Sequence, residues 1–141
     1  MSLLKATTLS ISILLVGCSA FSSSQQPNGR TDQSALAAYT KLGMQYLQAG
    51  DTASAKESLQ QAVLADPEYA PALNGLAMVF QAEREPDLAD QYFQRATQAD
   101  PNSAMIFNNY GAFLFSQQRF EEACKALARS TEDPFYTQRA Q

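Results

Sequence analysis

The chain has 141 residues, with 10 Lys and Arg against 14 Asp and Glu, two Cys and no His. This length allows one domain with a tail, and a domain of about 100 residues can bury enough apolar surface to fold alone. The net charge of −4 disfavours nucleic acid, whose binding needs Lys and Arg on the phosphates. Without imidazole, a Ser-His-Asp triad and an ordinary zinc site are excluded. We therefore predict a binding protein and no enzyme, with no metal, cofactor or small-molecule substrate.

Residues 1–17 are predicted to be an export signal. Lys5 provides one positive charge, and the chain is then apolar or small from Ala6 to Gly17. A helix that spans a bilayer needs about 20 apolar residues, so this shorter run fits the apolar part of a secretory signal. The alternative is an ordinary signal, or a short buried helix followed by a chance Cys.

The apolar run ends in Leu15-Val16-Gly17-Cys18, which resembles the lipobox of bacterial lipoproteins. The resemblance implies cleavage before Cys18, which then carries a thioether-linked diacylglycerol. Several acyl chains anchor a protein stably, whereas one chain is marginal. Ser19 follows, where an Asp would favour the inner membrane, so the resemblance implies the periplasmic face of the outer membrane.

Residues 18–34 are predicted to be a flexible tether that begins at the lipidated Cys18. The segment is rich in Ser and Gln, contains Pro27 and Gly29, and has no apolar period. Such a composition is typical of a linker with little structure of its own.

From Leu36 onward the sequence repeats with a period of 34 residues. The recurring apolar and small positions are Leu42, Leu76 and Tyr110; Gly43, Ala77 and Gly111; Tyr46, Phe80 and Leu114; Ala55, Ala89 and Ala123; Leu59, Phe93 and Leu127. Asp66-Pro67 recurs as Asp100-Pro101. This pattern resembles the tetratricopeptide repeat. The resemblance implies an all-α solenoid of antiparallel helix pairs.

Residues 35–134 are predicted to hold three full repeats, at about 36–69, 70–103 and 104–135. The expected helices are 35–49, 52–65, 70–83, 87–99, 103–117 and 120–131. Gly50 followed by Asp51 is predicted to end one helix and cap the next. The small recurring residues let the two helices of a repeat approach closely, while the large apolar residues fill the rest of the core.

Residues 135–141 are predicted to begin a fourth repeat. A repeat stack normally ends in a helix with a polar outer face, and no such helix is evident after Pro134. We therefore expect a truncated product, and the alternative is a natural three-repeat protein that a partner closes.

In tetratricopeptide domains, binding takes place in a groove lined by the first helix of each repeat. By register, the predicted groove residues are Thr40, Met44, Asn74, Met78, Asn108 and Phe115. Amide side chains can donate to and accept from a peptide backbone, and Met and Phe offer adaptable apolar contact. In the alternative interpretation, Asn74 and Asn108 join neighbouring repeats and the Met side chains belong to the core. Cys124 is expected to be a half-buried structural thiol.

The lipobox, the tether and the repeats together resemble the type IV pilus biogenesis/stability lipoproteins, the pilotins. The closest agreement lies in Gly50 to Lys56, Asn108 to Leu114, and Asp133-Pro134 with Tyr136. The resemblance implies an outer-membrane scaffold that binds and assembles the pilus secretin, although the family carries about twice as many repeats. The alternative is a general envelope adaptor that docks peptidoglycan enzymes or outer-membrane assembly factors.

Overall fold

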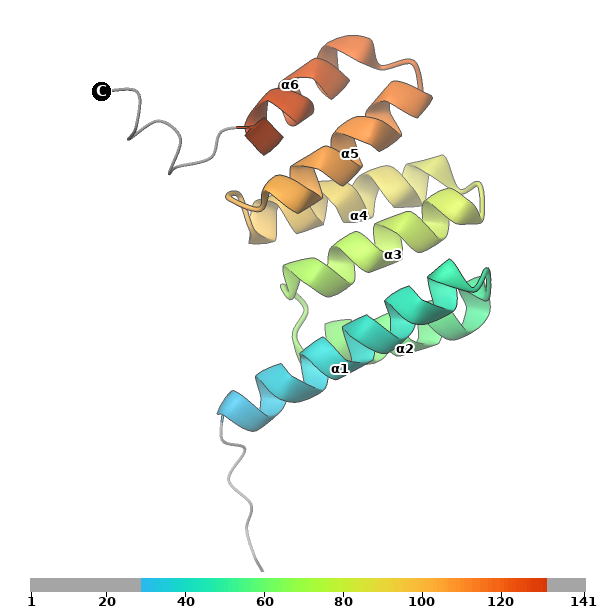
Figure 1. Ribbon diagram of the computed structural model, residues 1–141, viewed down its shortest axis with the longest axis vertical. Coiled ribbons are helices and arrows are strands. Elements are labelled where there is room, and N and C mark those ends of the chain that lie inside the picture. The colour runs from blue at the N-terminus through green and yellow to red at the C-terminus, as the bar shows by residue number, and fades with distance from the viewer. Residues whose placement is uncertain (1–28, 132–141) are drawn as a thin grey trace, which may run out of the picture.

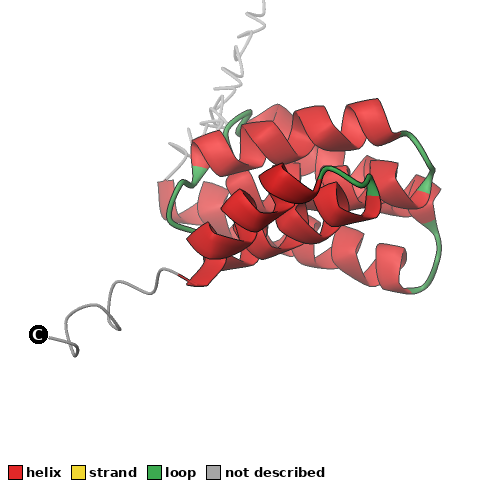
Figure 2. Cartoon of the chain, turned by 90° about the horizontal axis from the view of Figure 1, so that it is seen from above, coloured by secondary structure: helices red, strands yellow, loops and turns green. Residues whose placement is uncertain are grey.

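The computed structural model describes residues 29–131, which form helices joined by short loops (Figures 1 and 2). The helices are α1 Gly29–Gln48, α2 Thr52–Ala65, α3 Ala70–Ala82, α4 Pro86–Ala99, α5 Ala104–Ser116 and α6 Phe120–Thr131. They pair as three hairpins, each made of an A helix (α1, α3 or α5) and a B helix (α2, α4 or α6). The hairpins stack along the long axis, with α1 and α2 at one end and α5 and α6 at the other (Figure 1). The predicted all-α solenoid is confirmed.

The helix bounds agree with the predicted ones to within one residue, except at the start of α1. This helix begins at Gly29, six residues before the predicted position 35, so residues 29–34 of the predicted tether are helical. The segment RTDQS after Gly29 contains neither Pro nor Gly, and nothing in it opposes extension of the helix toward its N-terminus. The predicted signal, Cys18 and the predicted fourth repeat lie outside the described residues.

The same backbone turn closes all three hairpins, at positions 34 residues apart. Gly50, Arg84 and Gln118 have positive φ values of 82°, 63° and 63°. The N–H of the next residue donates to the carbonyl five residues earlier, at 2.9–3.0 Å, which satisfies the end of each A helix. Glycine adopts this conformation without steric cost, so the sequence revealed the turn clearly only at Gly50.

Close helix packing in the first two repeats depends on Leu59, which is fully buried in α2. A Cβ atom on Gly43 of α1 would lie 2.6 Å from the Leu59 side chain, and so would a Cβ atom on Gly75 of α3. The glycines therefore let α1 and α3 close on Leu59 from two sides. Asp51 caps the same helix, because its carboxylate accepts the N–H of Ser54 at 3.0 Å.

The first repeat differs from the second in how far its large apolar side chains are buried. On α3 the stripe Leu73, Leu76 and Phe80 is only 1–8% exposed, because it packs between α2 and α4. The equivalent side chains on α1 are 37–42% exposed, and we call them the α1 stripe: Tyr39, Leu42 and Tyr46. No described helix precedes α1 to cover them.

Candidate binding face

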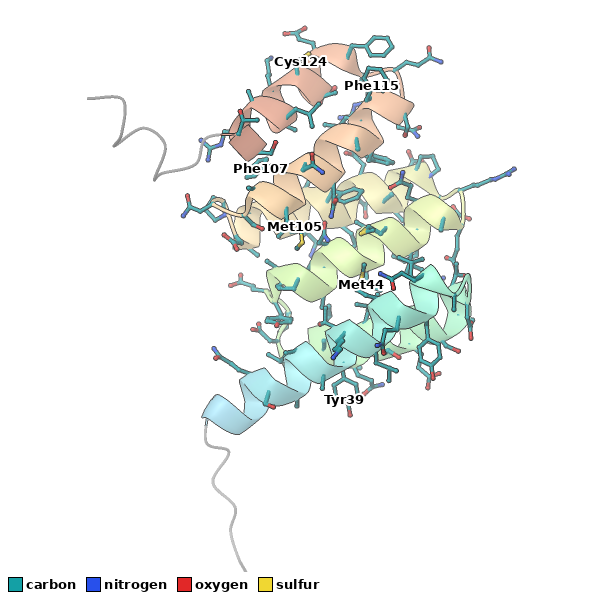
Figure 3. The ribbon with its side chains drawn as sticks, in the orientation of Figure 1. Tyr39, Met44, Met105, Phe107, Phe115 and Cys124 are labelled. Atoms are coloured by element: carbon teal, nitrogen blue, oxygen red, sulfur yellow. The ribbon has the colours of Figure 1, made fainter. Side chains whose placement is uncertain are left out.

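The residues predicted to bind a peptide lie on the A helices, which face the viewer in Figure 3. Thr40 and Met44 lie on α1, Asn74 and Met78 on α3, and Asn108 and Phe115 on α5. Their spacing of three or four residues, or of seven on α5, puts the members of a pair on one side of the helix. We call the surface formed by these positions the A-helix face.

Asn74 differs from the prediction, because its side chain lies beneath this face. The residue is only 3% exposed, and its Oδ1 accepts a hydrogen bond from Asn109 Nδ2 at 3.2 Å. Its own Nδ2 lies 3.8 Å from the sulfur of Met78. Asn74 therefore joins the second and third repeats and does not present its amide to a peptide. Asn109 was missed, since the equivalent residue one repeat earlier is Gly75 and no periodic signal exists.

The predicted residues on α1 and the remaining one on α3 combine surface and structural roles. Thr40 Oγ1 donates to the carbonyl of Leu36 at 2.8 Å, which occupies its hydroxyl within α1. Met44 is partly exposed, and Met78 packs against the main core. The Met78 sulfur also receives Asn109 Nδ2 at 3.8 Å. These side chains offer limited apolar surface to a partner.

The most accessible part of the A-helix face is on α5. Phe115 is 62% exposed and packs edge-on against Phe120, with ring centroids 5.3 Å apart. Asn108 is partly exposed. Met105, three residues before Asn108 on the same side of the helix, is 57% exposed. Sequence reasoning missed Met105, because the equivalent position in the second repeat is Pro71.

The A-helix face is neutral at every position named above, and the charged groups pair elsewhere. Arg119, in the turn between α5 and α6, lies 2.9 Å from Asp90 and 2.7 Å from Glu122. These hydrogen bonds, first from Glu122 and then from Asp90, raise the pKa of Arg119. The hydrogen bond from Arg119 in turn lowers the pKa of Glu122. A partner that binds the A-helix face therefore meets neutral, mostly apolar surface.

The junction between the second and third repeats contains a polar contact centred on Asp90. Tyr110 on α5 donates its hydroxyl to Asp90 Oδ1 on α4 at 2.7 Å. Burial, and then this hydrogen bond, raise the pKa of Tyr110 to about 12. The Tyr110 ring also stacks on Phe93, with centroids 5.5 Å apart. These contacts hold α5, and hence the open part of the A-helix face, against α4.

Cys124 is exposed, so the prediction of a half-buried thiol is wrong. The physical reason lies in the repeat register. Lys56 and Asp90, two repeats and one repeat earlier, contact the hairpin that follows their own, through Glu83 and Tyr110 respectively. Cys124 occupies the same position on α6, and no described helix follows α6 to cover it.

Within residues 29–131 we find no group of three or more Cys, Asp and Glu side chains placed to hold a metal ion. Over the same range, no helix combines the length and the hydropathy needed to cross a membrane. A hollow of about 370 Å³ opens between the C-terminal ends of α3 and α5, lined by Gln81, Arg84, Pro86, Phe113, Ser116 and Gln117. It lies at the end of the A-helix face where Phe115 projects.

Comparison with known proteins adds to this geometry. Residues 40–104 and 77–137 match the tetratricopeptide repeat family. The chain is 39% identical to the type IV pilus assembly protein PilF of Pseudomonas aeruginosa, over 99% of this chain and 56% of that protein.

Two solved structures resemble the fold and are also related in sequence. One comes from a functional characterisation of Pseudomonas aeruginosa PilF, with a TM-score of 0.72 and 44% identity over 77% of this chain and 49% of that one. The other is PilW, described as a widely conserved type IV pilus biogenesis factor, with a TM-score of 0.66 and 30% identity over 72% of this chain and 46% of that one. The chain therefore spans about half the length of these relatives.

Proposed function

The chain belongs to the tetratricopeptide repeat family, and from this premise we propose that it is an outer-membrane scaffold for type IV pilus biogenesis. In this role it faces the periplasm, binds the pilus secretin and promotes its assembly. The observation that carries the proposal is the 39% identity to a type IV pilus assembly protein, which extends over 99% of the chain. The neutral A-helix face supports a protein partner.

The anchor in this proposal is an acyl group on Cys18. Its support is the lipobox-like run Leu15-Val16-Gly17-Cys18 at the end of an apolar segment. In the Cys18→Ser variant the repeats should fold normally, but the protein should leave the outer-membrane fraction. Fractionation of the producing bacterium measures this, and unchanged retention of the variant in the outer membrane would contradict the anchor.

The binding surface in this proposal is the α5 part of the A-helix face. Met105 and Phe115 provide exposed apolar contact, and Asn108 lies between them with a partly exposed amide. Aromatic side chains that a partner covers often contribute most of the binding energy of an interface. The absence of charge at these positions favours a partner segment with mainly apolar and neutral polar side chains.

The test is the affinity of the secretin for the double variant Met105→Asp with Phe115→Asp. We expect at least a tenfold loss, equivalent to about 1.4 kcal/mol, because the partner must then cover two carboxylates. Leu64→Asp is the matched control, since Leu64 on α2 is 75% exposed and lies on a B helix. The thermal midpoints of both variants should stay close to that of the native chain.

Two outcomes would redirect the proposal. If the double variant binds the secretin as tightly as the native chain does, the A-helix face is not the binding surface. If the native chain does not bind the secretin but copurifies with peptidoglycan enzymes or outer-membrane assembly factors, the general envelope adaptor becomes the better description. Secretin multimers should also be depleted in cells that lack the chain.

A further inference from the structure

The two ends of the stack carry unpartnered surfaces that the fold matches to each other internally. At one end the α1 stripe, made of Tyr39, Leu42 and Tyr46, is 37–42% exposed. At the other end, α6 carries four neutral residues that we call the α6 outer face: Cys124, Leu127, Ala128 and Thr131. Figure 3 places Tyr39 at the lower end of the stack and Cys124 at the upper end.

Both internal junctions bring these same register positions together. At the first junction the Lys56 ammonium lies 5.0 Å from the ring centroid of Phe80, the residue equivalent to Tyr46. At the second, Asp90 accepts the hydroxyl of Tyr110, the residue equivalent to Leu42. Lys56 and Asp90 are themselves the residues equivalent to Cys124. The register therefore pairs Cys124 with Leu42 and Tyr46.

We propose that copies of this chain associate head to tail, with the α1 stripe of one copy docked on the α6 outer face of the next. In such a contact α1 takes the place that α3 takes on α2 within one chain. Leu42 and Tyr46 then become buried as Leu76 and Phe80 are, at 1% and 8% exposure.

The charges at the two ends agree with this pairing. Inside the chain, the charged residue at this position of the B helix meets an opposite charge: Lys56 pairs with Glu83, and Asp90 pairs with Arg119. At the ends both sides lose their charge together, since Cys124 replaces the B-helix charge and Ala49 is the residue equivalent to Glu83. Docking therefore buries no unpaired charge at this contact, which would otherwise be costly.

The proposed interface joins two different surfaces, so it is heterologous. Such an interface gives rings if the rotation closes and open filaments if it does not. The association is independent of the secretin, and it can hold or fail whether or not the proposed function is correct. Concentration of an anchored chain on a membrane would favour it.

The test is cross-linking with a short bis-maleimide in bacteria that produce two differently tagged full-length chains. One copy carries Leu42→Cys with Cys124→Ser, and the other keeps its native Cys124. We expect a product that carries both tags, because Leu42 of one copy should lie beside Cys124 of the next. A control copy with Leu64→Cys and Cys124→Ser should give at least tenfold less of this product, since Leu64 belongs to neither end face.

A second variant separates association from folding. Tyr46→Asp, added to the Leu42→Cys copy, should reduce the two-tag product at least tenfold while the helical circular dichroism signal persists, because Tyr46 is already 37% exposed. The proposal is overturned if no two-tag product forms, if the Leu64→Cys control gives as much, or if Tyr46→Asp leaves the yield unchanged. Preferential linkage between two native Cys124 residues would overturn it in favour of tail-to-tail association. A Cys124 that resists maleimide would overturn it too, because later residues of the same chain would then cover α6.

Discussion

The two junctions inside the stack place different chemistry at equivalent positions. At the first, Leu76 on α3 is fully buried, and the ion pair between Lys56 and Glu83 lies at the rim, with side chains 30% and 23% exposed. At the second, the equivalent of Leu76 is Tyr110, which is partly exposed and donates to Asp90. The 34-residue period thus preserves where neighbouring hairpins touch, while the interaction changes from apolar packing to a hydrogen-bonded pair.

The largest effect should come from breaking the apolar junction with Leu76→Asp. An unpaired carboxylate buried there costs several kcal/mol, against a total stability of about 5–15 kcal/mol, so we expect the stack to unfold. The loss of helical circular dichroism measures this. Leu42→Asp, at the same position of the first repeat and 41% exposed, should remain folded. Equal stability of the two variants would contradict the distinction between the first repeat and the junction.

A smaller effect is expected from breaking the polar junction with Asp90→Ala. The substitution removes the acceptor of the Tyr110 hydroxyl and one of the two partners of Arg119. Loss of one such contact from a partly buried pair should cost about 1–3 kcal/mol in the free energy of unfolding. The urea midpoint measures this. Asp87→Ala on the same helix is the control and should cost less than about 1 kcal/mol, as for an exposed charge near a helix N-terminus.

Alkaline pH should weaken the second junction selectively. The pKa of Tyr110 is raised from 10 to about 12 in the folded chain, so folding favours the protonated phenol. Its contribution to stability is therefore complete below pH 10 and is lost as the pH rises from 10 to 12. In Tyr110→Phe this part of the decline should disappear, whereas Tyr39→Phe should keep it. Denaturant midpoints between about pH 8 and 12 test the prediction, and identical pH profiles of the native chain and Tyr110→Phe would refute it.

The smallest effect is expected for Lys56→Ala at the rim of the first junction. Lys56 pairs with Glu83 and lies over the Phe80 ring, but its side chain is 30% exposed. Exposed ion pairs contribute at most about 1 kcal/mol, so the thermal midpoint should shift by only a few degrees. Lys125→Ala, which removes a pair with side chains 73% and 85% exposed, should shift it less. A loss at Lys56 as large as that of Asp90→Ala would mean that both junctions depend on charge.

The helices could be predicted from the sequence, because Gly50, the Asp-Pro pairs and the 34-residue period mark their ends and their packed sides. The start of α1 could not, since no capping residue or helix breaker marks Gly29. Those signals are local or periodic. A contact between two repeats that does not recur every 34 residues leaves no such signal.

The candidate binding face shows the same limit. Register correctly put Met44, Asn108 and Phe115 on the A helices, but it could not show that Asn74 is buried by a hydrogen bond to Asn109. It also missed Met105, whose equivalent in the second repeat is Pro71. Exposure of Cys124 depends on whether another helix packs on α6, and the repeat pattern alone does not determine this.

The side-chain contacts that join the repeats all connect residues close in sequence. They span 20 residues from Asp90 to Tyr110, 27 from Lys56 to Glu83, and 35 from Asn74 to Asn109. Low sequence separation of contacts goes with fast folding, and in a repeat stack the process can start in any hairpin and spread to its neighbours. A chain that emerges from a secretion channel N-terminus first could therefore complete each junction as soon as the next hairpin appears, without waiting for its C-terminus.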